Sequence, residues 1–200
     1  MNRIDLISEI FVKGNLTRGV EVGSFKGQYA NEILRRWNGH LFMVDVWSEL
    51  GDEYMDSSNH KNFDNTVYAD CLNNVSEFEL RSTMIRTNSE IGSSLFENES
   101  LDFVYIDANH AYEFVKHDIS YWYPKVKKGG YLMGHDYINL DWKTPPFAEN
   151  GIDKHIWSDG GFYHGVFGVN PAVDEFCSQN NYSLNLTDEW FGTWFIQKKY

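Results

Sequence analysis

Apolar residues follow two alternating patterns along this chain: short continuous runs and stripes with helical spacing. The runs "TRGVEVG" (17–23), "HLFMVDV" (40–46) and "LDFVYID" (101–107) each contain or end in an acidic residue. Continuous apolar runs of this length are typical of strands covered on both faces, as in a parallel sheet. Between the first two runs, residues 28–37 carry an apolar stripe with the spacing of an α-helix.

The same alternation continues to the end of the chain. It predicts helices over 4–12, 62–75, 88–96, 112–126 and 171–181, and strands over 83–87, 129–136, 182–188 and 190–199. Repeated strand–helix units indicate an α/β sheet with helices on both faces. Because the last two strands are joined tightly around 188–189, one of them must be antiparallel. No repeat or linker interrupts the chain, so one domain over residues 1–200 is expected.

Composition and charge limit the kinds of molecule that this protein is expected to bind. A net charge of −12 argues against nucleic acid and against an anionic membrane surface, because both attract Lys and Arg. A small neutral or cationic substrate fits this charge better. Two cysteines without metal-ligand spacing, a start that lacks a signal-peptide pattern, and no run of about 20 apolar residues predict a cytoplasmic protein.

Polar residues gather where the predicted strands end. Ligands of such sheets bind beyond the carboxyl ends of the strands. The segments at those ends are Glu21–Gly27, Asp45–Trp47, Thr87–Glu90, Asp107–His110 and His135–Tyr137. We therefore expect one site built from five separate segments.

The first of these segments is a glycine turn, "GSFKG", between a strand and a helix. Gly23 allows a sharp turn and Gly27 lets the following helix pack closely. A dinucleotide turn also needs a middle glycine, so that bare backbone can approach the pyrophosphate. Phe25 stands at that position, which favours S-adenosylmethionine, a ligand without a pyrophosphate.

Two acidic residues complete the predicted nucleoside site. Asp45 follows Gly23 by 22 residues and is placed to accept hydrogen bonds from ribose hydroxyls. That spacing fits a nicotinamide dinucleotide equally well, and an exposed acid at a strand end is the alternative. Glu21 discriminates better, because an acid there can face the ammonium group of a methionine tail.

Several motifs together resemble a known family. "VEVGSFKG", "FMVDVW", "RTNSEIG", "DFVYIDANHAY" and "VKKGGYLMGHDY" occur in that order within residues 17–136. They are similar to class I S-adenosylmethionine-dependent methyltransferases, most of all to small-molecule O-methyltransferases of the catechol and macrocin type. The resemblance implies a Rossmann-like, doubly wound, seven-stranded sheet with its last strand antiparallel, in a three-layer αβα arrangement.

The resemblance also implies roles for individual residues. The family's E-x-G-x-x-x-G motif corresponds to Glu21, Gly23 and Gly27. Asp45 would bind the ribose and Trp47 would lie beside the adenine.

Two further segments complete the implied donor site. Ser89 and Glu90 match the family's adenine-contacting pair. Ser24, with the backbone of the glycine turn, would line the methionine end.

The reacting end is expected around "DANH". Methyl transfer needs the acceptor oxygen placed against the methyl group and its proton removed. In macrocin-type enzymes the histidine of this D-x-x-H element is the proposed base, and His110 occupies that place beside Asp107. The alternative is a histidine that only caps the following helix.

Family members also bind Mg²⁺ through acids at these strand ends. The matching positions carry Asp107, His135 and Asp136, and His135 departs from an all-oxygen set. Three interpretations stay open: Mg²⁺ on Asp107 and Asp136 with waters, Mn²⁺ with an imidazole ligand, or no metal.

Other functions stay open as well. A nicotinamide-dependent oxidoreductase, a non-catalytic nucleoside-binding relative and a metal-dependent enzyme of other chemistry are the alternatives. Residues 137–168, rich in Gly and aromatics, are expected to form a lid over the acceptor site. Their aromatic content favours a sugar or phenol as the small-molecule acceptor, and packing in a homodimer is the alternative role.

Overall fold

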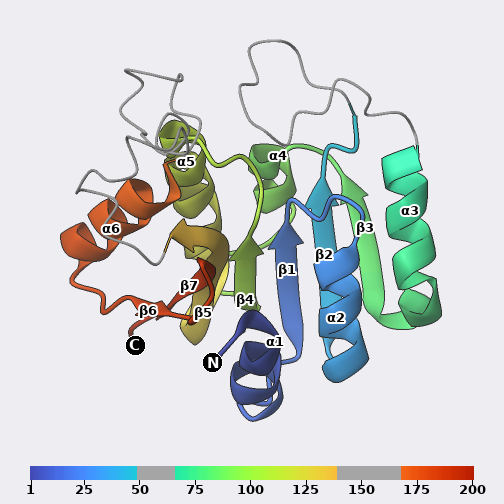
Figure 1. Ribbon diagram of the computed structural model, residues 1–200, viewed down its shortest axis with the longest axis horizontal. Coiled ribbons are helices and arrows are strands. Elements are labelled where there is room, and N and C mark those ends of the chain that lie inside the picture. The colour runs from blue at the N-terminus through green and yellow to red at the C-terminus, as the bar shows by residue number, and fades with distance from the viewer. Residues whose placement is uncertain (49–65, 139–167) are drawn as a thin grey trace.

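The computed structural model describes residues 1–48, 66–138 and 168–200, and these form one sheet flanked by helices (Figure 1). The strand order is β3-β2-β1-β4-β5-β7-β6. The strands are β1 (Arg18–Val22), β2 (His40–Asp45), β3 (Ser82–Arg86), β4 (Leu101–Ile106), β5 (Val126–Ile138), β6 (Asn185–Leu186) and β7 (Phe191–Gln197). Strands β1 to β5 pair in parallel, and β7 pairs antiparallel with both β5 and β6. The predicted antiparallel last strand is confirmed.

Helices alternate with the strands. They are α1 (Arg3–Leu6), α2 (Gln28–Arg36), α3 (Thr66–Val75), α4 (Ser89–Ser94), α5 (Tyr112–Trp122) and α6 (Val169–Asn180). Helical segments of other types follow three of them: the π-helical η1 (Ile7–Val12) and the 3₁₀ segments η2 (Ser76–Arg81) and η3 (Tyr123–Lys125). Helix α4 begins after Asn88, whose side chain accepts the backbone N–H of Ile91 at 2.8 Å and caps the helix.

Alternating strand residues pack into two hydrophobic cores, one on each face of the sheet. Val104 and Ile106 of β4 pack with α5 and α6, whereas Phe103 and Tyr105 of the same strand pack with α1, α2 and α3. A strand buried on both faces is expected to carry a continuous apolar run, and residues 103–106 of β4 form such a run. The three-layer arrangement predicted from the sequence is therefore confirmed.

Some element bounds differ from the sequence prediction. The opening helix 4–12 changes from α-helix to π-helix at Ile7, and the strand expected over 182–188 is reduced to two residues. Strand β5 is longer than 129–136, because it continues beyond the glycine pair at its start. The expected lid falls almost wholly on 139–167, outside the described residues.

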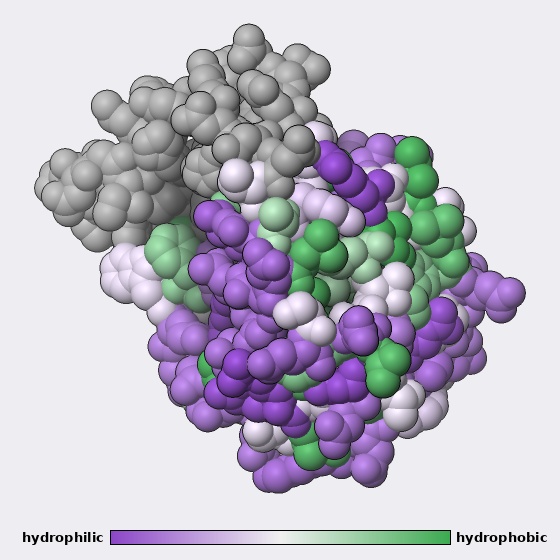
Figure 2. Space-filling view, turned by 90° about the vertical axis from the view of Figure 1, so that its right-hand side faces the viewer, coloured by the Kyte–Doolittle hydropathy of each residue, from purple (hydrophilic) through white to green (hydrophobic). Residues whose placement is uncertain are grey.

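The described surface carries scattered apolar side chains. Figure 2 faces the side of the molecule that lies at the right of Figure 1, where polar surface is interrupted by apolar patches. Leu72, Leu80, Ile91 and Leu95 are among the exposed apolar residues. Single exposed apolar residues are normal, so they do not by themselves define a docking surface. Among the described helices none is long and apolar enough to cross a bilayer.

Strand register brings the predicted site segments to one edge. Val22 of β1 pairs with Val44 of β2 and with Ile106 of β4. The next residues, Gly23 and Asp107, therefore leave the sheet at the same level, beside Asp45. Backbone hydrogen bonds continue across this edge, from Gly23 N–H to Val44 at 2.8 Å and from Asp107 N–H to Val22 at 2.8 Å.

Candidate active site

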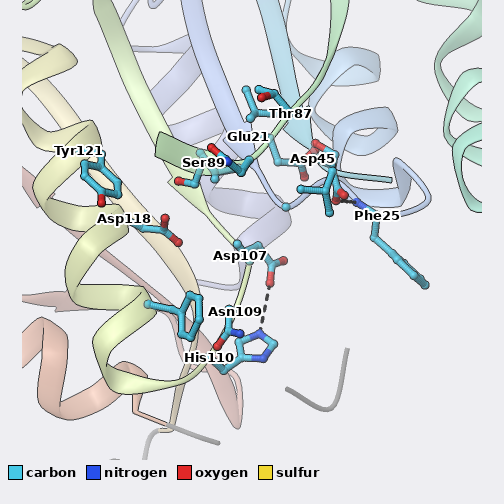
Figure 3. Close-up of a pocket in the computed structure, with 18 of the residues that line it drawn as sticks. Glu21, Phe25, Asp45, Thr87, Ser89, Asp107, Asn109, His110, Asp118 and Tyr121 are labelled. Atoms are coloured by element: carbon cyan, nitrogen blue, oxygen red, sulfur yellow. Dashed lines mark hydrogen bonds and ion pairs between the residues drawn. The ribbon is translucent and has the colours of Figure 1, made fainter. Parts of the chain in front are cut away.

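A cavity of about 620 Å³ opens at the carboxyl ends of the parallel strands (Figure 3). The predicted site residues that line it are Glu21, Gly23, Ser24, Asp45, Ser89, Glu90, Asp107 and His110. They come from the ends of β1, β2 and β4 and from the start of α4. Four of the five segments that the sequence places at one site therefore share this cavity, and the fifth, His135–Tyr137, does not line it.

The glycine turn passes directly over the end of β4. Gly23 has φ +86°, and a Cβ added there would lie 2.1 Å from the carbonyl oxygen of Asp107 and 2.7 Å from Cα of Ala108. Both obstacles are backbone atoms, which cannot rotate away as a side chain can. Only glycine combines this conformation with this approach.

The backbone of the turn binds a carboxylate of the protein itself. Asp45 accepts the N–H of Phe25 on Oδ2 and the N–H of Trp47 on Oδ1, both at 2.8 Å. Phe25 has φ +47°, so the turn reaches this arrangement without a middle glycine. The amide that a pyrophosphate would use is thus already occupied, which agrees with a ligand that has none. Burial raises the pKa of Asp45, and these backbone N–H groups oppose that shift.

Two predicted donor-site residues face away from the cavity. Trp47 is 1% exposed, donates its indole N–H to the carbonyl of Phe25 at 2.7 Å and packs edge-on against Tyr68. Its ring packs in the core beside α2 and α3 and does not line the cavity, whereas the sequence interpretation placed it beside the adenine. Gly27 also lies outside the cavity lining. A Cβ there would come within 2.8 Å of Cys71 Sγ, so this glycine lets α2 pack against α3 and is not a ligand contact.

One part of the cavity concentrates charge. Arg3 reaches it from α1, with its guanidinium 4.2 Å from the ring centre of Tyr29 and 3.9 Å from Asp107. Glu21 is 2% exposed, and its Oε2 has no hydrogen-bond partner among residues 1–48, 66–138 and 168–200. Burial raises the pKa of Glu21 to about 8, and the charge of Asp107 adds to the rise. A cationic ligand group here would pair with Glu21 and favour its ionised form.

A cluster of two histidines and two aspartates lies next to this charged part. His110 Nε2 lies 2.8 Å from Asp136 Oδ2 and 3.9 Å from Asp107 Oδ1. His135 Nδ1 lies 2.9 Å from the other oxygen of Asp136. The two imidazoles hold the pKa of Asp136 well below its usual range, although burial alone would raise it. His110 lines the main cavity, whereas His135 and Asp136 do not.

The cluster has a donor set that fits a metal ion of intermediate softness. Asp107, His110 and Asp136 each offer one ligand atom, and these atoms lie within 4.8 Å of one another. This set includes His110 in place of the His135 considered from the sequence. Two carboxylates and an imidazole suit Mn²⁺ better than Mg²⁺, which prefers oxygen ligands throughout.

Asp118 is a cavity residue that the sequence interpretation missed. It is 5% exposed and lines the cavity together with Ser89. Burial raises the pKa of Asp118 to about 7, and a hydrogen bond with the Ser89 hydroxyl partly opposes this shift. A signal was present in the sequence, since Asp118 stands in the buried stripe of α5 with Val115, Ile119 and Trp122. Arg3, by contrast, has no local signal.

The shifted pKa of Asp118 predicts a pH-dependent stability. Between its unfolded pKa of 3.8 and its folded pKa of about 7, the native carboxyl retains a proton that the unfolded chain has released. The free energy of unfolding should therefore fall as pH rises through this window, by up to about 4 kcal/mol. Urea denaturation from pH 4 to pH 8 would measure this, with Asp118→Asn as the reference that cannot titrate. A constant difference between the two proteins across this range would contradict the prediction.

Comparisons with known proteins agree with this geometry. Residues 20–137 match the family model described as a methyltransferase domain. No curated protein matches the chain in sequence. Among solved structures, an O-methyltransferase family protein from Burkholderia thailandensis superposes with a TM-score of 0.68 at 15% identity, covering 98% of this chain and 55% of that one. The chain thus spans about half the length of that protein.

Two further structures share the fold. A provisionally named caffeoyl-CoA O-methyltransferase from Staphylococcus aureus gives a TM-score of 0.66 at 16% identity, covering 98% of this chain and 84% of that one. Fibrillarin from Aeropyrum pernix, solved with bound S-adenosyl-L-methionine, gives 0.55 at 13% identity, covering 90% and 66%. At these identities the likeness shows the fold. With a family model that covers more than half of its length, the chain belongs to the methyltransferase-domain family.

Proposed function

We propose that the protein transfers the methyl group of S-adenosylmethionine to a hydroxyl oxygen of a small acceptor, with His110 as general base. The observation that carries this proposal is the position of His110, on the cavity wall and 2.8 Å from the carboxylate of Asp136. A histidine oriented by a carboxylate is a group suited to accept a hydroxyl proton near neutral pH.

The proposed reaction is a displacement at the methyl carbon together with a proton transfer from the acceptor. The acceptor oxygen attacks the methyl carbon, the bond from that carbon to the sulfonium sulfur breaks, and the donor leaves as the neutral thioether S-adenosylhomocysteine. The hydroxyl proton passes to the imidazole of His110. Because Nε2 contacts Asp136, we assign the proton of the neutral imidazole to Nε2 and proton acceptance to Nδ1.

The charged part of the cavity supports the donor assignment. A methionine tail carries an ammonium and a carboxylate, and the cavity offers Glu21 for the first and Arg3 for the second. Asp45 keeps acceptor capacity for the ribose after accepting its two backbone N–H groups. These side chains match the polar groups of the donor in order from tail to ribose.

A metal is the second candidate feature, favoured by the convergent ligand atoms of Asp107, His110 and Asp136. Bound there, Mn²⁺ would polarise the acceptor hydroxyl and lower its pKa. His110 would then hold the ion, and proton removal would fall to another base or to water. Transfer assays with Mn²⁺, Mg²⁺ or a chelator discriminate the two forms of the proposal.

An oxygen acceptor is supported by the names of the structural relatives. Both the Burkholderia and the Staphylococcus proteins are described as O-methyltransferases. Mass spectrometry of mixtures of phenols, sugars and matched amines, incubated with enzyme and donor, would test the acceptor atom. We expect methylated hydroxyl compounds. Methylation of amines alone would overturn the proposal of an oxygen acceptor.

Calorimetry tests the donor site directly. We expect S-adenosylhomocysteine to bind about tenfold or more tightly than 5′-methylthioadenosine, because only the former carries the charged tail that Glu21 and Arg3 would bind. NADH should not bind, since the amide of Phe25 is already used by Asp45. Equal affinity for the two nucleosides would contradict the assigned tail site. Tight binding of NADH without S-adenosylhomocysteine would favour the oxidoreductase alternative.

A further inference from the structure

Asp118 is a buried acid that the methyl-transfer reaction does not use. It projects from α5 into the cavity, on the opposite side from Asp45 and Phe25 in the view of Figure 3. Burying a carboxyl group costs free energy unless hydrogen bonds replace its water. The other buried residues of α5 facing this core, such as Val115 and Ile119, are apolar. An acid at this point therefore calls for a ligand-related explanation.

Neighbouring side chains hold Asp118 in a defined position. The indole N–H of Trp122 donates to the hydroxyl oxygen of Ser89 at 2.8 Å. Because the oxygen of Ser89 accepts this bond, its hydroxyl proton remains available for a second partner. The hydroxyl hydrogen-bonds to Asp118. A carboxyl group offers about four lone-pair sites, so one hydroxyl leaves capacity for a ligand. Ser89 is its one hydrogen-bonding side chain in the described parts of the chain.

The cavity has a charged part and an aromatic part, and Asp118 lies in the aromatic part. Phe114, Asp118 and Tyr121 stand on one face of α5 at intervals of four and three residues, and all three line the cavity. Aromatic side chains stack with nucleic acid bases. The charged residues Arg3 and Glu21 belong to the other part. A donor with its tail at the charged part therefore directs its adenine toward Asp118.

We propose that Asp118 recognises the six-amino group of the adenine of S-adenosylmethionine, positioned for this by Ser89 and Trp122. This proposal rests on the use of that donor by the enzyme. One carboxyl oxygen accepts an N–H of the amino group. In its protonated form the same carboxyl also donates to the adjacent ring nitrogen, N1, so that acceptor and donor match the edge of the base. With a pKa of about 7, the protonated form is substantially populated at neutral pH.

The test compares two ligands that differ only at the six position. Calorimetry would measure the affinity of S-adenosylhomocysteine and of its purine analogue, in which hydrogen replaces the six-amino group. We expect the wild-type protein to prefer S-adenosylhomocysteine by about tenfold, the usual effect of one such hydrogen bond. Asp118→Leu should bind both ligands within about twofold of each other.

Two further variants separate recognition from general damage. Asp118→Asn keeps an acceptor and a donor at the same place, so it should retain most of the preference. Glu113→Gln removes an exposed acid from the same helix and should change neither affinity. Wild-type protein that binds both ligands equally would overturn the proposal. So would Asp118→Leu if it weakened both by the same factor, which is the signature of a merely structural residue.

The experiment also distinguishes this proposal from the function on which it rests. Wild-type protein that fails to bind S-adenosylhomocysteine at all contradicts the donor assignment itself and overturns the role of Asp118 with it. Binding without discrimination at the six position overturns only the role of Asp118. The wild-type comparison needs no variant, so it remains decisive even if Asp118→Leu does not fold.

Discussion

Replacing Gly23 with alanine is expected to weaken binding of S-adenosylhomocysteine by at least about 100-fold. The added Cβ would lie 2.1 Å from the carbonyl oxygen of Asp107, on a residue with φ +86°. The left-handed backbone alone costs an alanine about 1–2 kcal/mol. The overlap must in addition displace either the turn or the segment Asp107–Ala108, and both line the cavity.

The position of the donor would change with either displacement. The turn also carries the N–H of Phe25 that holds Asp45, so a shift of the turn would release the carboxylate proposed to bind the ribose. Calorimetry with S-adenosylhomocysteine measures the lost affinity, and urea denaturation measures the accompanying loss of stability. Affinity equal to that of the wild-type protein would show that the turn does not bind the donor.

Gly129 offers a matched control. It also has a positive φ, +77°, but the nearest atom to its added Cβ is the hydroxyl oxygen of Tyr200 at 2.7 Å, at the end of an exposed side chain that can move. It lies near the start of β5, outside the cavity lining. Gly129→Ala should therefore lose a similar backbone contribution to stability and keep the affinity for S-adenosylhomocysteine.

Replacing His110 with alanine should lower the rate of methyl transfer by about 100-fold or more, the usual contribution of a general base. The donor affinity should change by less than about threefold, because His110 stands beside Asp136, away from the residues assigned to the ribose and base. Single-turnover transfer to the hydroxyl compound found in the acceptor screen measures the rate. Calorimetry with S-adenosylhomocysteine measures the affinity.

Variants around His110 separate a base from a metal ligand. His110→Gln keeps a polar side chain, but an amide does not accept a proton near neutral pH. Its rate of methyl transfer should therefore be as low as that of His110→Ala. His40 is half-buried and hydrogen-bonded to Thr83 at 2.8 Å at the amino end of β2, so it is a control histidine that should be replaceable. Undiminished transfer by His110→Ala would refute the base. Weakened Mn²⁺ binding in His110→Ala, measured by electron paramagnetic resonance, would indicate a ligand.

The candidate site shows which features local sequence patterns predict and which depend on contacts between distant parts of the chain. Asp45 and Asp107 were predicted because each ends a buried strand, and the register of parallel strands then fixes their common edge. Trp47 does not line the cavity, although it is only two residues from Asp45. Its φ of +40° and the hydrogen bond of its indole to Phe25 turn the ring into the core. A strand pattern ends with the strand and says nothing of the rotation that follows.

The chain by itself determined which segments are strands and helices, that the sheet is covered on both faces, and that the first turn suits a nucleoside without a pyrophosphate. These properties follow from period and steric size, which each short segment carries alone. Only the tertiary structure decided that Arg3 lies near Asp107 and that the carboxylate of Asp136 contacts His110. It also decided that Asp118 is buried deeply enough to have a pKa of about 7. Charge pairing and desolvation depend on neighbours far away in the chain, and no local pattern records which neighbours those will be.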